Sequence, residues 1–190
     1  MMSTAEISDL TNSRLQAIAI PLTDTHDSVI ARLLDHWDNT KADQPKVVKP
    51  GDPIGTHDDG RTMIFDPATP PQLNFTTPSQ AIINGKKLSK GETYWNTMMN
   101  IMIREVYATG HNGQAIHDML FINACVGKKE DNGYKFLEDV GISVQGQDSN
   151  AAFRQTYQLA ALNAVGFEIN FRWQDNEKAA YPNREAVMSL

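Results

Sequence analysis

Seven of the nine prolines in the chain fall between residues 39 and 80. Proline has no backbone N–H and cannot donate a hydrogen bond inside a helix or a central strand, so this stretch excludes long regular structure. We predict a proline-rich linker over 39–80, with one short strand at 62–66. The linker separates a strand-helix arm, residues 1–38, from a mixed α/β domain, residues 81–190, and the predicted fold class is α+β.

The arm combines a short apolar segment with an amphipathic one. Residues 15–22 predict a strand that Pro21 ends, and residues 26–37 predict a helix that Asp24 or Thr25 caps. The helix carries an apolar stripe that must be buried, against its own domain or against a second copy of the chain. An amphipathic helix near a terminus often forms a dimer contact, so we predict a homodimer. The stripe comprises Val29, Ile30, Leu33, Leu34 and Trp37.

The segment "LQAIAIPLTDTHDSVIARLLDHW", residues 15–37, resembles the ribbon-helix-helix class of DNA-binding proteins. In that class, strands from two subunits pair and enter the major groove, and the helices form the dimer. The resemblance implies that Gln16 faces the groove and that Arg14 flanks it. The chain departs from the class in one respect, because prolines begin soon after the first helix where the class has a second one.

The domain begins with a hairpin and two helices. Asn84-Gly85, between apolar residues, predicts a two-residue turn. Ser89 and Glu92 have capping-box spacing, which predicts a helix from about residue 90 that Gly110 ends. A further helix is predicted over residues 113–125.

The last block is predicted as a β-α-β unit. "GISVQ" and "FEINFRW" alternate like strands, and the residues from 149 to about 165 between them have helical spacing. The simplest connection is a right-handed crossover between parallel strands, although another strand can lie between them. We expect the tail after Trp173 to be mobile apart from Tyr181.

Basic residues gather in one part of an acidic chain. The formal net charge is −6, but residues 81–129 hold six basic and three acidic side chains, a balance of +3 that leaves −9 for the rest. Because phosphate binding depends on clustered Lys and Arg, this segment predicts a DNA-binding face. The predicted contacts are Lys86, Lys87, Lys90, Lys128 and Lys129.

The loop after "GISVQ" predicts a helix cap. Gly141 and Gly146 have the spacing of a phosphate-binding loop, but the Lys and Ser or Thr that complete that motif are absent. Asp148 instead fits the role of a helix cap. The alternative is a polar rim that binds a ligand or partner, formed by Gln145, Gln147, Ser149 and Asn150.

Several chemistries have no support in the sequence. Cys125 is the single cysteine, the histidines lack metal-site spacing, and we find no nuclease carboxylate-lysine triplet or nucleophile elbow. We expect no metal and no cofactor. The chain has no apolar run of membrane-spanning length and starts without a leader pattern, so we expect a cytoplasmic protein without membrane contact.

These patterns predict a non-enzymatic DNA-binding accessory or regulatory protein of a prokaryotic, phage or plasmid DNA-processing or defence system. One alternative is an inhibitor or adaptor whose acidic face occupies the nucleic-acid site of a protein partner. Another is a small nucleotide-using enzyme with its site at loop 145–150.

Overall fold

The computed structural model describes residues 8, 11–13, 16, 25, 27–34, 49–57 and 59–190. The chain divides into two units, residues 1–47 and 48–190, and each is described by itself.

In the first unit, residues 27–34 are helical. Thr25 Oγ1 accepts a hydrogen bond from Ser28 N at 3.2 Å, and Ser28 Oγ accepts one from Thr25 N at 2.9 Å. This reciprocal pair confirms the predicted cap at Thr25. Val29 is buried, whereas Ile30, Leu33 and Leu34 are exposed.

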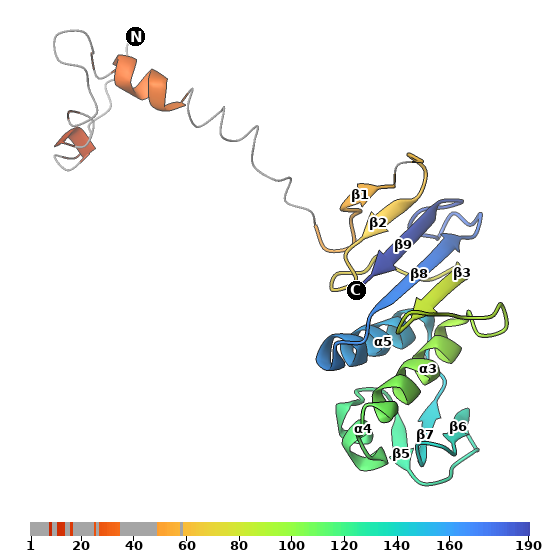
Figure 1. Ribbon diagram of the computed structural model, residues 1–190. Coiled ribbons are helices and arrows are strands. Elements are labelled where there is room, and N and C mark those ends of the chain that lie inside the picture. The colour runs from red at the N-terminus through yellow and green to blue at the C-terminus, as the bar shows by residue number, and fades with distance from the viewer. Residues whose placement is uncertain are drawn as a thin grey trace. The chain divides into compact units, whose positions relative to one another are not determined.

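Six strands of the second unit form one mixed sheet in the order β1-β2-β9-β8-β3-β4 (Figure 1). β2 and β9 run parallel, and the other neighbouring strands run antiparallel. The described part of 49–80, predicted as linker, supplies β1, β2 and most of β3, and the predicted short strand at 62–66 is confirmed as β2. The strands are β1 (Gly55–Thr56), β2 (Met63–Phe65), β3 (Thr76–Ile83), β4 (Lys86–Lys87), β8 (Phe167–Trp173) and β9 (Glu185–Ser189).

The predicted hairpin joins β3 to β4. Asn84 and Gly85 have φ angles of 50° and 72°, the left-handed pair that a type I′ turn requires. Gly adopts this conformation without steric cost and Asn tolerates it, which explains why these two residues occupy the turn.

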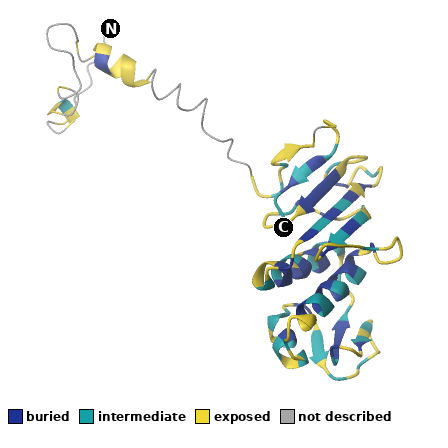
Figure 2. Ribbon diagram, viewed as in Figure 1, coloured by how far each residue is buried: buried dark blue, intermediate teal, exposed yellow. Residues whose placement is uncertain are grey.

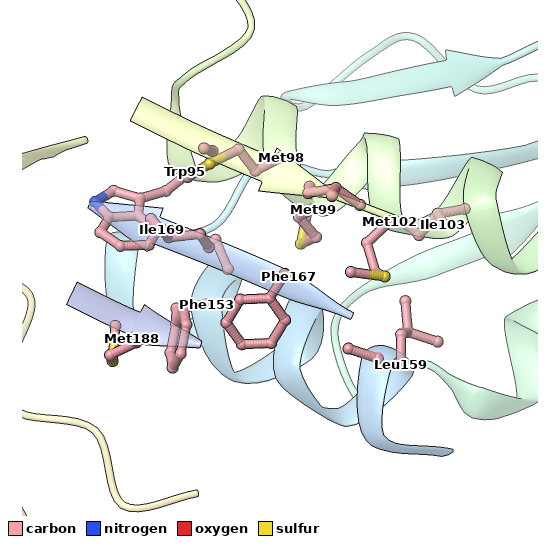
Figure 3. Close-up of a cluster of buried hydrophobic side chains, with 14 of the residues drawn as sticks. Trp95, Met98, Met99, Met102, Ile103, Phe153, Leu159, Phe167, Ile169 and Met188 are labelled. Carbon is pink, nitrogen blue, oxygen red and sulfur yellow. The ribbon is translucent and has the colours of Figure 1, made fainter. Parts of the chain in front are cut away.

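Two helices, α3 (Trp95–Ala108) and α5 (Ser149–Asn163), cover one face of this sheet (Figure 1). Apolar side chains of α3, α5 and the sheet interdigitate in the core between them, as Figure 3 shows. Burial is concentrated in this layer (Figure 2). The predicted inward alternation of β8 is confirmed, because Phe167, Ile169, Phe171 and Trp173 are all buried.

A second sheet, with the order β5-β7-β6, is antiparallel throughout. Its strands are β5 (Ala124–Val126), β6 (Tyr134–Leu137) and β7 (Ile142–Gln145), and the short helix α4 (Gly113–Met119) packs beside it. A Cβ atom at Gly113 would lie 2.5 Å from the carbonyl oxygen of Val140, so the start of α4 requires glycine for this close approach.

The helices α3 and α4 differ from the predicted ones, α3 in its first residue and α4 in its last. α3 begins at Trp95, because the carboxylate of Glu92 accepts hydrogen bonds from Ser89 N and Oγ that close a turn rather than cap a helix. The apolar residues that repeat at helical spacing in this segment predict a buried face, and that prediction is confirmed for Trp95, Met98, Met99, Met102 and Val106. The helix predicted over 113–125 ends at Met119, since Ala124–Val126 pairs with β7 as a strand.

The predicted parallel crossover is wrong. The order strand, helix, strand holds for β7, α5 and β8, but β7 lies in the small sheet, and the neighbours of β8 are β3 and β9, both antiparallel to it. The tail is also ordered, because Glu185–Ser189 forms β9 between β2 and β8. The helical spacing of residues 149–165 predicts one buried face made of Phe153, Tyr157, Ala160, Ala161 and Ala164. Phe153 and Ala160 are buried and Tyr157 is half-buried, but Ala161 and Ala164 are exposed.

Candidate nucleic-acid interface

The face of the main sheet opposite the helices carries polar side chains. Glu168, Asn170 and Arg172 alternate with the buried residues of β8, so they point away from α3 and α5. Asn170 Nδ2 donates to Glu168 Oε1 at 3.1 Å, while Arg172 is exposed beside Thr77 of β3. β8 therefore contributes polar side chains to this face, which it shares with the apolar partners Ile82 and Val187.

The first half of β3 is a free edge of the sheet. β4 pairs only with Ile82 and Ile83, and the register against β8 shifts between Pro78 and Gln80. A proline and a bulge both suit an edge, because Pro78 has no N–H to offer a neighbouring strand.

The segment from Leu88 to Tyr94 runs back along this edge. Leu88 N donates to Ala81 O at 2.9 Å at one end, and Trp95 Nε1 donates to Thr76 Oγ1 at 3.0 Å at the other. An open cavity of about 560 Å³ lies between this segment and the edge of β3, near these two hydrogen bonds. Its lining residues are Thr77, Pro78, Ser79, Gln80, Lys87, Leu88, Lys90, Thr93, Tyr94 and Arg172. Three of them are cationic and none is a carboxylate, so this cavity, which we call the edge groove, has a positive local charge.

A second cavity, of about 420 Å³, adjoins the same arginine. It is lined by Gly60, Arg61, Arg172, Asn183, Arg184 and Glu185, and we call it the arginine cavity. Arg172 Nη2 donates to Asn183 Oδ1 at 3.0 Å, and Arg184 Nη2 donates to Arg61 O at 3.5 Å. These contacts orient two guanidinium groups without neutralising them.

The turn that carries Arg61 is fixed by an aspartate. Asp59 Oδ1 accepts hydrogen bonds from Thr62 N at 3.0 Å and Arg61 N at 2.8 Å, and its Oδ2 accepts one from Thr62 Oγ1 at 2.9 Å. The hydrogen bond from Thr62 N, followed by the others, lowers the pKa of the Asp59 carboxyl to about 2. The Asp59 carboxylate therefore stays ionised and accepts its hydrogen bonds within its own turn.

Because Arg172 lines both cavities, they form one cationic surface. We define this surface by Arg61, Lys87, Lys90, Arg172 and Arg184. Against these five cations the lining contains one carboxylate, that of Glu185, a local balance of +4 on a chain whose net charge is −6. Within the described part of the chain, no salt bridge involves any of the five. Their positive charge is available to an anionic ligand.

The five lysines predicted as contacts fall in two places. Lys87 and Lys90 line the edge groove, and Lys86 on the same hairpin forms a salt bridge with Glu105 at 3.3 Å. Lys128 and Lys129 lie in the turn between β5 and β6 of the small sheet.

Local partners already balance the charge of that second turn. Lys128 Nζ lies 3.0 Å from the carboxylate of Glu130, and Lys129 Nζ lies 4.0 Å from that of Asp131. Lys129 also lies 4.0 Å above the centre of the Tyr134 ring. Lys128 and Lys129 therefore have carboxylate partners, whereas Lys87 and Lys90 have none among the described residues.

The predicted contacts in the arm are described only in part. Arg14 lies outside the described residues, as does most of the strand predicted over 15–22. Gln16 is described, and it is exposed and helical.

The cap predicted in loop 145–150 is confirmed. Asp148 Oδ1 accepts hydrogen bonds from Asn150 N at 2.8 Å and Ala151 N at 3.1 Å. The hydrogen bond from Ala151 N is the largest cause of a lowered pKa for the Asp148 carboxyl.

The other polar groups of this loop bind within the protein. Ser149 Oγ donates to Leu73 O at 2.9 Å, and Asn150 Oδ1 accepts from Leu73 N at 2.8 Å. Gln145 Nε2 donates to Asn132 O at 2.9 Å, and Gln147 Nε2 donates to Gln145 O at 2.9 Å. Of the rim predicted to face solvent or a partner, Ser149 and Asn150 connect α5 to the segment before β3, and Gln145 binds the turn before β6.

The cavity beside this loop, of about 860 Å³, is polar and open. Asp148 and Arg154 are its charged lining residues, so its charges balance. It offers no net attraction to an anion, in contrast to the cationic surface.

Three arginines and a tyrosine of the candidate site were not predicted. Arg172 had a signal, because the alternation of "FEINFRW" places it on the polar face of β8. Arg61 and Arg184 lie far apart in sequence and meet only because β2 pairs with β9. Tyr94 was assigned to a helix that in fact begins one residue later.

No family model matches the chain, and comparisons with curated proteins and with solved structures find no significant similarity. None of the described helices is long and apolar enough to cross a lipid bilayer. In the described ranges, no group of three His, Cys, Asp or Glu side chains lies close enough together to hold a metal ion.

Proposed function

We propose that this protein binds DNA through its cationic surface and acts as an accessory or regulatory protein. The observation that carries the proposal is the pair of cavities joined at Arg172, with five cations and one carboxylate. Clustered Lys and Arg side chains displace the counterions of the phosphate backbone, which supplies most of the sequence-independent affinity for DNA. An open sheet face at the edge of β3 leaves this charge accessible.

The test is DNA binding by fluorescence anisotropy across a salt series. Removing the two charges in K87Q/K90Q is expected to weaken binding on every sequence and to lower the slope of log K against log salt by about 2. The matched control is K128Q/K129Q, which removes two lysines that already have carboxylate partners. We expect the control to bind like the wild type. Equal losses in both variants would contradict the assignment of the surface, and no binding by the wild type at any salt concentration would favour a protein-binding adaptor.

We also propose that the helix described over residues 27–34 forms a contact with a second copy of the chain. Ile30, Leu33 and Leu34 lie three and four residues apart, so they share one helix face, and all three are exposed. An exposed apolar stripe of this kind supports association.

A further inference from the structure

Tyr94 is an exposed aromatic ring in the wall of the edge groove. Its side chain is 59% exposed, and it lines the cavity together with Lys87, Lys90 and Arg172. Tyr94 precedes the first residue of α3, where its backbone is extended and its side chain makes no capping hydrogen bond. Within the described ranges its ring packs against no other aromatic ring. The fold therefore presents a large apolar surface among cations without using it internally.

The floor of the groove has a different chemistry. Thr77, Ser79 and Gln80 line it with hydroxyl and amide groups along the free edge of β3. The Ser79 hydroxyl donates to Asn170 O at 3.2 Å and keeps its capacity to accept, while Thr77 and Gln80 carry groups that can donate and accept, as the edges of unpaired bases do. An aromatic ring, hydrogen-bonding groups and cations that line one cavity are the components that hold a base and its phosphate.

The shape of the surface favours one strand over two. In a duplex the bases are stacked and paired inside, so a side chain at the edge of a sheet cannot stack on a base face. The surface also crosses three strand spacings from β4 to β9, roughly 14 Å at about 4.8 Å each. A strip of this width, whose cations line the same cavity as one exposed aromatic ring, suits a few nucleotides of a single extended strand.

We infer that the DNA bound here is single-stranded and that one of its bases stacks on the ring of Tyr94. The inference rests on the proposed function and specifies the ligand of the same surface. Phosphates contact Lys87 and Lys90 on one side of the stacked base and the arginine cavity on the other.

The experiment compares three labelled probes in an anisotropy assay: an oligo-dT strand, a duplex of the same length, and a strand of the same length without bases. We expect the wild type to bind the strand at least 10-fold more tightly than the duplex. Y94A is expected to weaken binding to the strand about 5- to 100-fold, the range typical of base-aromatic stacking. Y94F keeps the ring and is expected to bind like the wild type.

The strand without bases separates stacking from charge. On that probe Y94A and the wild type are expected to bind equally, because the phosphates are unchanged. Y107A is the matched control, since Tyr107 is a half-exposed tyrosine of α3 that does not line the groove. Y94L, which keeps apolar bulk at the helix start, provides a second variant if Y94A melts early; it is expected to lose affinity as Y94A does.

The failures of the two proposals are distinguishable. If duplex and strand bind equally and K87Q/K90Q weakens both, DNA binding stands and the single-strand inference is overturned. If Y94A and Y94L bind the strand like the wild type, stacking is overturned. If the wild type binds none of the three probes, both proposals fall.

Discussion

We expect the substitution Asn96→Ala to destabilise the protein by about 2 kcal/mol. Asn96 of α3 forms two hydrogen bonds with the backbone of one residue in loop 145–150: its Nδ2 donates to Gln147 O, and its Oδ1 accepts from Gln147 N, both at 2.8 Å. Removing both bonds costs about 2 kcal/mol if water replaces the partner, and more if the backbone groups stay dry. Alanine has a higher helix propensity than asparagine, which returns roughly 0.5 kcal/mol. Because both residues are half-buried, water replaces the lost partners only in part, and the loss exceeds about 2 kcal/mol. The gain in helix propensity then brings the net cost to about 2 kcal/mol.

Denaturant unfolding with an unchanged m-value measures this cost directly. The same loss lowers the melting temperature by roughly 4–8 °C for a chain of this size. The matched control is Thr97→Ala, another half-buried polar residue in the same turn of α3, whose side chain forms no hydrogen bond within the described residues. We expect it to be neutral or slightly stabilising. A cost below about 0.5 kcal/mol for Asn96→Ala, or equal effects of the two variants, would refute the conclusion that this pair fixes the loop on α3.

Asp148→Ala is expected to lower stability by about 0.5–2 kcal/mol at pH 7, whereas Gln147→Ala, which leaves the cap intact, costs less. Because the hydrogen bond from Ala151 N lowers the pKa of Asp148 in the folded state, this contribution is present above the unfolded pKa, near 4, and is lost as the pH falls through the folded pKa. Between pH 7 and pH 2, the melting temperatures of the wild type and of Asp148→Ala should therefore converge as the pH falls. A difference that stays constant with pH would contradict the assignment of this stability to the charged cap. The double substitution of Leu33 and Leu34 by Asp is expected to yield soluble monomer in light scattering, and an unchanged mass would place the apolar stripe inside the protein.

Local sequence patterns predicted the elements that depend mainly on their own residues. The strict alternation of "FEINFRW" identified both faces of β8, and the Asn84-Gly85 turn followed from backbone sterics alone. The start of α3 was not predictable in this way, because Ser89 and Glu92 have the spacing of a capping box but close a turn, in which the Ser89 hydroxyl donates to the Glu92 carboxylate instead of accepting from a helix N–H.

Pairings between distant residues explain the remaining differences. β9 was predicted as a mobile tail because its five residues show no polar-apolar alternation of their own and gain their partners only from β2 and β8. The same reason applies to the candidate site. Lys87 and Lys90 were identified from a cluster in sequence, but Arg61 and Arg184 join them only through the pairing of β2 with β9.

The place of β9 between β2 and β8 has a consequence for biosynthesis. Met63 pairs with Ala186, so a nascent chain carries β1 and β2 while more than a hundred further residues are translated before β9, the partner of β2, emerges from the ribosome. Until then β8 has a vacant edge, which is a template for unwanted pairing with other chains. A product that stops before Glu185 would lack the strand that joins the two halves of the sheet. Termination of translation between β8 and β9 should therefore yield aggregated protein rather than a shortened folded one.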